Sequence, residues 1–211
     1  MKKHIAILDP FPRTLKLIFS KDKFKALKSR YELIYAPKKY KKNFYDKNIH
    51  KASFIIGQPD LPKDLLLKAK KLKAVINVES NFMNNMDYQY CFKKGIYVIA
   101  TSPVFSKPVA EIALGMTLSL LRNIHTAHSD FIKGKEKYGL ESNHNASLLS
   151  GKKIGLLGFG DLAKSLYPLL LPFSKDINVY DPWIPKINIQ KLGFKSISLN
   201  KMFESCEVIY V

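Results

Sequence analysis

The hydrophobic positions along the chain alternate between the spacing of a strand and the spacing of a helix. Short apolar runs predict strands in the first half. These runs are residues 5–8, 31–35, 54–57, 74–78 and 97–100. Between them, helical spacing predicts helices over residues 14–29, 61–71 and 88–93. Strands that alternate with helices are typical of a parallel sheet covered on both faces, so the pattern predicts an α/β fold.

A long apolar helix is predicted after this alternating region. Ser106 suits the N-cap and Pro108 is tolerated in a first turn, so we expect the helix to begin at Ser106. From Val109 to Ile124 the residues are apolar on nearly every side. Such a helix is expected where two domains meet. We therefore predict two domains, residues 1–106 and residues 107–211.

A glycine-rich motif lies in the second predicted domain. Residues 153–157 predict a strand, and residues 164–171 have helical spacing. The pattern G-x-G-x-x-A between them consists of Gly158, Phe159, Gly160, Asp161, Leu162 and Ala163. A second predicted strand, residues 177–180, ends at Asp181. A preceding strand, a following helix and an acid after the next strand are the context of a dinucleotide-binding fold.

Each residue type in this motif has a physical role in binding a dinucleotide. Gly158 permits the tight turn, Gly160 lets the backbone approach a pyrophosphate, and Ala163 keeps the helix close to the strand. The N–H groups and the dipole of the first helical turn attract phosphate. The carboxylate of Asp181 can accept hydrogen bonds from the adenosine ribose and would repel a 2′-phosphate. The motif therefore predicts NAD, in preference to NADP, as the cofactor.

The chain is strongly basic. It has 35 Lys and Arg against 17 Asp and Glu, a formal net charge of +18. Residues 1–106 hold 22 of the basic and 8 of the acidic residues. Nearly all of the excess is lysine, whereas nucleic-acid recognition favours the planar fork of arginine. We therefore expect lysines on solvated helix faces and no nucleic-acid partner.

The composition excludes several other classes of protein. Cys91 and Cys206 are far apart, which excludes a disulfide scaffold and a zinc module. The longest apolar stretches, residues 112–121 and 166–173, are too short or too interrupted to span a bilayer. The N-terminus lacks the pattern of a signal peptide. We expect a cytoplasmic protein without a metal site and without a membrane partner.

Taken together, these features resemble the D-isomer-specific 2-hydroxyacid dehydrogenase family over nearly the whole chain. The similar segments are Asn85-Met86-Asp87, Thr101-Ser102-Pro103, Val109-Ala110-Glu111 and residues 150–182. The resemblance implies a flavodoxin-like substrate domain followed by the first half of a Rossmann-type NAD-binding domain. The implied reaction is hydride transfer between C2 of a 2-hydroxy acid and nicotinamide. It also implies Pro182 beside the cofactor, a small 2-hydroxy or 2-oxo acid as substrate, and a homodimer at full length.

The resemblance also implies where the substrate binds. The family's glycine-rich substrate loop corresponds to residues 78–82, where Ser80 and Asn81 are the best candidates to hold a substrate carboxylate. The lost glycines leave the identity of the hydroxy acid open. Arg13 and residues 57–59 are further candidates at the same edge of the sheet. Asp161 replaces a basic or neutral residue of the family, so we expect only its backbone to assist the pyrophosphate.

The length of the chain leads to one further expectation, which concerns the catalytic residues. The family's catalytic histidine, glutamate and arginine lie further along than residue 211, so we expect no catalytic residue within this chain. Two such domains need roughly 300 residues, and we predict only the first-half strands of the second domain, at residues 153–157, 177–180 and 208–211. The sequence therefore predicts a dehydrogenase truncated at its C-terminus. A non-catalytic NAD-binding or regulatory protein and a lysine-rich nucleic-acid binder are the alternatives.

Overall fold

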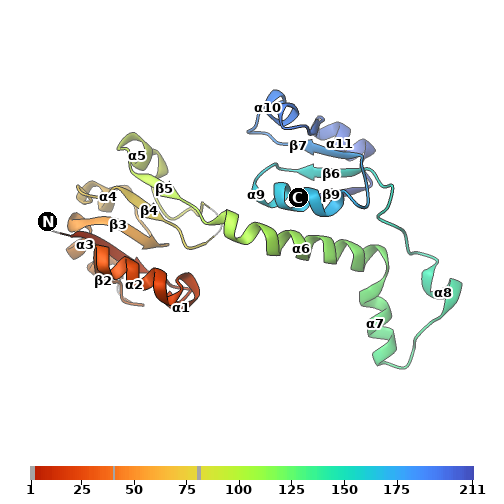
Figure 1. Cartoon of the computed structure of the whole chain (residues 1–211), viewed down its shortest axis with the longest axis horizontal. Helices are drawn as coiled ribbons and strands as arrows, with labels where there is room; N and C mark the ends of the chain where they lie inside the picture. Colours follow the sequence, from red (N-terminus) through yellow and green to blue (C-terminus); the bar gives the residue numbers. More distant parts are fainter. Residues whose placement is uncertain (1–2, 40, 80–81) are drawn as a thin grey trace. The chain divides into compact units, whose positions relative to one another are not determined.

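The chain folds into two compact units. Unit 1 comprises Met1–Ser102 and unit 2 comprises Pro103–Val211. The computed structural model describes residues 3–39, 41–79 and 82–211. Figure 1 shows each unit as a sheet with helices packed around it.

Among the described residues, unit 1 has a five-stranded parallel sheet (Figure 1). Its strands are β1 (His4–Asp9), β2 (Tyr31–Tyr35), β3 (Ala52–Gly57), β4 (Ala74–Ile76) and β5 (Tyr97–Ile99). They lie in the order β2-β1-β3-β4-β5, and every neighbouring pair is parallel. This is the flavodoxin-like order of a doubly wound sheet. The fold class predicted for the first domain is therefore confirmed.

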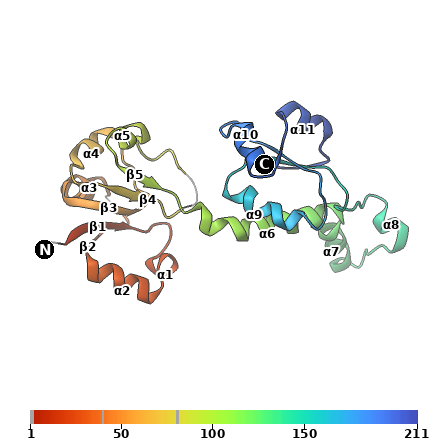
Figure 2. The same ribbon diagram turned by 45° about the horizontal axis from the view of Figure 1, so that its top comes forward.

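Helices cover both faces of this sheet (Figures 1 and 2). One face carries Ile7, Ile55 and Val75 and packs against α3, η1, α4 and α5. The other face carries Leu8 and Ile56 and packs against α1 and α2. The bounds are α1 (Leu15–Ile18), α2 (Lys21–Arg30), α3 (Lys41–Asn48), η1 (Ile49–Lys51), α4 (Lys63–Lys68) and α5 (Tyr88–Lys93). Because successive strand residues point to opposite faces, each strand contributes to both cores.

The single helix predicted over residues 14–29 is wrong in one respect. The structure has two helices there, and Ser20 lies between them with an extended backbone. The N–H of Lys23 donates to Ser20 Oγ at 3.4 Å. A serine in this position satisfies an N–H group that the start of a helix leaves unpaired. Capping by Ser20 therefore starts a new helix inside a segment whose hydrophobic spacing is continuous.

Unit 2 has a four-stranded parallel sheet in its described residues. The strands are β6 (Ile154–Leu157), β7 (Ile177–Tyr180), β8 (Lys195–Ser196) and β9 (Val208–Tyr210), in the order β8-β7-β6-β9. This matches the first four positions of the 3-2-1-4 Rossmann order, which confirms the predicted fold class. One strand assignment is wrong. The sequence predicts residues 208–211 as a strand of the first half, but β9 pairs with β6 on the side away from β7 and so begins the second half. The third strand of the first half is β8, which hydrophobic spacing did not reveal.

The helices of unit 2 are α6 (Ser102–Leu121), α7 (Ile124–Ile132), α8 (Gly139–Asn143), α9 (Asp161–Leu170), α10 (Lys186–Lys191) and α11 (Leu199–Ser205). The expected start of α6 at Ser106 is wrong, because the helix begins at Ser102 and contains Pro108 in its interior. Pro103 occupies the first turn instead, where proline is tolerated. Ser106 is buried, and its Oγ donates to the carbonyl of Pro103 at 3.0 Å.

Helix α6 is apolar on two sides. One side, with Ala110, Ala113 and Leu114, packs against the core of unit 2. The other side is exposed. By length and composition this 20-residue helix could also cross a membrane, so the expectation that the apolar stretches are too short is wrong for α6. A core helix of a soluble protein meets the same criteria, but such a helix is mostly buried, whereas only 17% of the apolar window of α6 is buried.

Candidate functional site

The glycine motif lies where β6 passes into α9 (Figure 1). Gly158 has φ +98°, a conformation that residues with a side chain rarely adopt. Its N–H donates to the carbonyl of Tyr180 at 2.7 Å, which joins the end of β6 to the end of β7. Gly160 is the N-cap of α9. The first turn of α9 therefore opens at the carboxyl edge of the sheet, where doubly wound folds bind ligands.

The local fold does not require a glycine at position 160. Its φ is −78°, which any residue can adopt. A Cβ built on it would meet no other atom within 4 Å. The space in front of Gly160 is therefore open, as a pyrophosphate lying against the helix N-terminus needs. Ala163, one turn further along, packs against the core of unit 2 and keeps α9 close to the sheet.

Asp181 connects the glycine loop to the turn after β7. Its Oδ2 accepts from the N–H of Phe159 at 2.8 Å. Its Oδ1 accepts from the N–H groups of Trp183 at 2.8 Å and Ile184 at 2.9 Å. Burial by itself raises the pKa of this carboxyl group, but the three backbone hydrogen bonds and the nearby charge of Lys164 outweigh it and lower the pKa. The group is therefore a carboxylate at neutral pH.

The remaining residues of the motif differ in their surroundings. Phe159 is fully buried and makes an edge-to-face contact with Phe194, with 4.5 Å between ring centroids. Its side chain fixes the loop to the core, so only its backbone faces outward. Asp161 is half-buried in the first turn of α9, whereas Leu162 and Pro182 are exposed. The ring of Phe159 also lies beneath the Nζ of Lys164, 5.5 Å from the centroid.

Sequence reasoning missed two features of this region. The first is the double role of Asp181, which anchors the loop through Phe159 as well as standing at the end of β7. The second is Trp183, whose side chain is 89% exposed beside that carboxylate. An Asp that accepts from N–H groups two and three residues later forms a common turn, so the Asp181-Pro182 pair was a usable signal for the turn that holds Trp183 but not for the contact with Phe159.

At the carboxyl edge of the sheet in unit 1, Glu79 connects the segments that follow several strands. Arg13 donates to both carboxylate oxygens of Glu79, at 2.8 and 2.9 Å. The N–H of Glu79 donates to Gln58 Oε1 at 3.1 Å, and Thr101 Oγ1 donates to the carbonyl of Glu79 at 3.0 Å. Segments that follow β1, β3, β4 and β5 therefore meet at this residue. The structure thus brings together Arg13, Gln58 and the start of the predicted substrate loop, while Ser80 and Asn81 lie outside the described residues.

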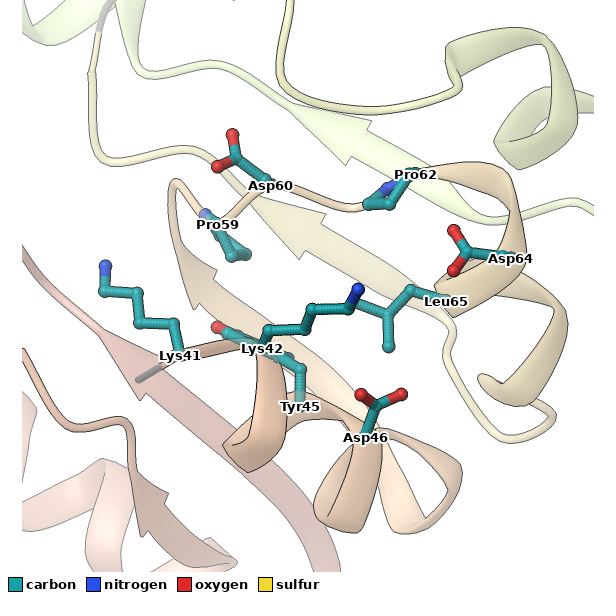
Figure 3. A pocket seen from close by; sticks show the side chains of 9 residues that line it. All are labelled: Lys41, Lys42, Tyr45, Asp46, Pro59, Asp60, Pro62, Asp64 and Leu65. Carbon is teal, nitrogen blue, oxygen red and sulfur yellow. The ribbon is translucent and has the colours of Figure 1, made fainter. Parts of the chain in front are cut away.

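A cavity of about 400 Å³ lies in unit 1 between α3 and the segment before α4 (Figure 3). Lys41, Lys42 and Tyr45 of α3 line one side of it, and Pro59, Asp60 and Pro62 line the other. Behind the cavity, buried Asp9 accepts from Lys41 Nζ at 2.7 Å and from the Tyr45 hydroxyl at 3.1 Å. Burial, followed by the charge of Asp9, raises the pKa of Tyr45, which stays neutral. These contacts fix α3 to the end of β1.

No group of three His, Cys, Asp or Glu residues suited to a metal occurs in the described part of the chain.

Comparisons with known proteins match this chain to one family of dehydrogenases. The model of the D-isomer specific 2-hydroxyacid dehydrogenase NAD binding domain matches residues 114–211. A phosphoglycerate oxidoreductase structure from Rhizobium etli is 40% identical with a TM-score of 0.82, over 98% of this chain and 65% of that one. This chain belongs to the D-isomer-specific 2-hydroxyacid dehydrogenase family. Unit 2 contains the residues that match the NAD-binding domain of the family, and NAD is the cofactor that the glycine motif predicts.

Two curated relatives show the extent of the similarity within the family. The hydroxypyruvate reductase of Thermotoga maritima is 31% identical over 147 residues, which are 69% of this chain and 45% of the relative. The D-3-phosphoglycerate dehydrogenase of Methanocaldococcus jannaschii is 30% identical over 152 residues, 70% of this chain and 28% of the relative. The matched region thus spans less than half of each relative.

Proposed function

We propose that this protein is an NAD-dependent oxidoreductase that transfers hydride between C2 of a 2-hydroxy acid and nicotinamide. The observation that carries the proposal is the geometry around Asp181. Its carboxylate joins the Gly158–Gly160 loop to the end of β7 at the carboxyl edge of a Rossmann-type sheet. A ribose bound there meets an ionised acceptor, and a pyrophosphate meets the open N-terminus of α9.

The residues present fit a dinucleotide. The open space at Gly160 and the outward-facing backbone of the first turn of α9 would receive the two phosphates. Asp181 would accept from an adenosine ribose hydroxyl through Oδ2, which takes one backbone N–H and has acceptor capacity left. The exposed Pro182 and Leu162 would border the cofactor. The bound NAD supplies the hydride acceptor or donor. The contribution of unit 2 in this proposal is to hold and orient the dinucleotide.

Unit 1 would hold the substrate acid in this proposal. The Arg13–Glu79 ion pair and Gln58 hold the start of the loop that continues into Ser80 and Asn81. We propose that backbone N–H groups of these two residues bind the substrate carboxylate. We assign no acid/base catalyst to this chain.

A cytoplasmic location is part of the same proposal, and it is consistent with Cys91 and Cys206 being free thiols. The absence of nucleic-acid and membrane partners stays a prediction.

Replacing Asp181 with asparagine should change the cofactor preference. NADH should bind the wild-type chain and NADPH should not, because the carboxylate of Asp181 repels a 2′-phosphate. The neutral amide of the variant does not repel it. In the variant, NADH affinity should fall about tenfold, as expected for losing a hydrogen bond to a charged group. The ratio of NADPH to NADH affinity should rise by about tenfold or more. Titration of the fluorescence of both reduced cofactors measures the two affinities.

The matched control is Asp176→Asn. Asp176 precedes β7, at the opposite edge of the same sheet, and its carboxylate pairs with Lys195 at 3.1 Å. This variant removes the same charge from unit 2 and should keep the wild-type preference. Equal losses of NADH and NADPH affinity in Asp181→Asn would assign Asp181 to anchoring the loop and not to reading the ribose. An absence of NADH binding to the folded wild-type chain would contradict the proposed function itself.

We also propose that the protein forms a homodimer through unit 2. In both views α7 and α8 lie away from the sheet of their unit (Figures 1 and 2). Large apolar side chains along α6 and α7 are exposed. They are Ile112, Met116, Leu120, Ile124, Phe131 and Ile132. An exposed apolar surface of this kind is typical of a protein interface.

Sedimentation velocity should therefore give twice the monomer mass for the wild-type chain. The double variant Met116→Lys/Leu120→Lys should sediment as a monomer, because it places two charges on this surface. Leu17→Lys is the control, since Leu17 is exposed in unit 1. A wild-type monomer at high micromolar concentration, or a double variant that stays dimeric, would contradict this interface.

A further inference from the structure

Trp183 is the single tryptophan of the chain, and its side chain is 89% exposed. Tryptophan is highly buried on average, so an indole left in solvent needs a reason. Its backbone is well held, because its own N–H and that of Ile184 donate to Asp181 Oδ1. Ile184 packs into the core of unit 2. The indole is therefore presented outward from a turn that is anchored on both sides.

The same carboxylate connects Trp183 to the glycine loop. Asp181 Oδ1 accepts from Trp183 and Oδ2 accepts from Phe159, so one functional group holds both segments. Trp183 is two residues from Asp181, a chain distance of about 7 Å at most. An adenine attached to a ribose on Asp181 would thus lie within reach of a long aromatic side chain at residue 183.

Two prolines restrict the backbone of the turn that carries Trp183, at residues 181–182 and 184–185. Pro182 precedes Trp183, and Pro185 is the N-cap of α10. Each proline fixes its own φ and restricts the residue before it. Of the described residues, none makes a ring contact with Trp183, whereas Phe159 and Tyr167 both contact Phe194 edge to face in the core. The indole faces are therefore available for a planar ligand.

We propose that the indole of Trp183 stacks on the adenine of the bound dinucleotide and sets the affinity for its adenosine half. The inference rests on the proposed function and adds a residue to the site. Stacking between an aromatic side chain and a base suits this position, because it needs one exposed flat face and no particular hydrogen bond. From the usual strength of such stacking, truncating the indole should weaken binding of an adenosine ligand about tenfold or more.

The fluorescence of this single tryptophan provides the test. Titration of the full chain with NAD⁺ or ADP-ribose should quench Trp183 emission saturably, because stacked adenine quenches an indole. Nicotinamide mononucleotide, which lacks the adenosine half, should leave the emission unchanged. Calorimetry of the same titrations gives the affinities without relying on Trp183.

Variants separate stacking from a structural role. Trp183→Leu should lower the affinity for ADP-ribose about tenfold or more, and Trp183→Phe should restore most of it. Phe203→Leu is the control, since Phe203 is another exposed aromatic residue of unit 2. Wild-type affinity of Trp183→Leu for ADP-ribose, or NAD⁺ binding that leaves Trp183 emission unchanged, would overturn the inference while leaving the proposed function intact. A wild-type chain that binds neither NADH nor ADP-ribose would overturn both. If instead Trp183→Leu changes only the sedimentation of the chain, the indole belongs to a protein interface and the inference is wrong.

Discussion

Gly160→Thr should reduce NADH affinity by about 100-fold or more without reducing the stability of the fold. The structure leaves open space at this position, and the backbone there is extended with φ −78° and ψ −165°. Threonine ranks close to glycine as an N-cap, so α9 should start equally well. Its branched side chain would, however, occupy the space where the backbone must approach the pyrophosphate.

Two measurements on the same protein check this result. Fluorescence titration gives the dissociation constant for NADH, and thermal unfolding followed by circular dichroism should give a midpoint within about 2 °C of wild type. Gly115→Thr is the matched control, because a Cβ at Gly115 also meets nothing within 4 Å but lies on α6. Unchanged NADH affinity in Gly160→Thr would show that no phosphate approaches this residue. Gly158 cannot serve this purpose, since its φ of +98° means that a substitution would strain the loop as well.

Gly57→Ala should destabilise unit 1 by more than about 4 kcal/mol, which is the range of exceptional single substitutions. Gly57 ends β3 with φ +154°, and it is the register partner of Asp9 in β1. A Cβ at this position would lie 2.1 Å from the backbone carbonyl oxygen of Asp9. Asp9 cannot move aside at low cost, because it is buried and bonded to Lys41 and Tyr45. The clash therefore falls on the two central strands of the sheet.

Urea unfolding followed by circular dichroism measures this effect. The transition of the variant should move to much lower urea than the transition of the wild type. Gly95→Ala is the control, since Gly95 has φ +68° but a Cβ there meets nothing within 4 Å. That substitution should cost only about 1–2 kcal/mol of backbone strain. Equal effects of the two substitutions would show that the contact with Asp9 is not the cause.

Elements with a strong local pattern could be predicted closely from the sequence. The strands at Tyr31–Tyr35 and Ile177–Tyr180 have the predicted bounds, and so does the helix at Tyr88–Lys93. Each is bounded by clear changes in residue type, such as Gly95 after the last of them. By contrast, α3 is a run of mostly polar residues whose helical state depends on the contacts of Tyr45 with the core and with Asp9. The two-residue strand β8 exists only because β7 lies beside it.

The alternating α/β order and the glycine motif, and with them the family and the cofactor, were determined by the sequence alone. These depend on residue types at fixed short spacing, where the periodicity of strands and helices and the missing Cβ of glycine act locally. Only the tertiary structure decided that Asp181 bonds to Phe159, that Trp183 stands exposed beside it, and that Glu79 joins the segments after four strands. The contacts of Asp181 with Phe159 and of Glu79 with Gln58 and Thr101 join segments 21 or 22 residues apart, and their geometry depends on how the strands are ordered in each sheet. Strand order is a property of the packed core, which no local pattern contains.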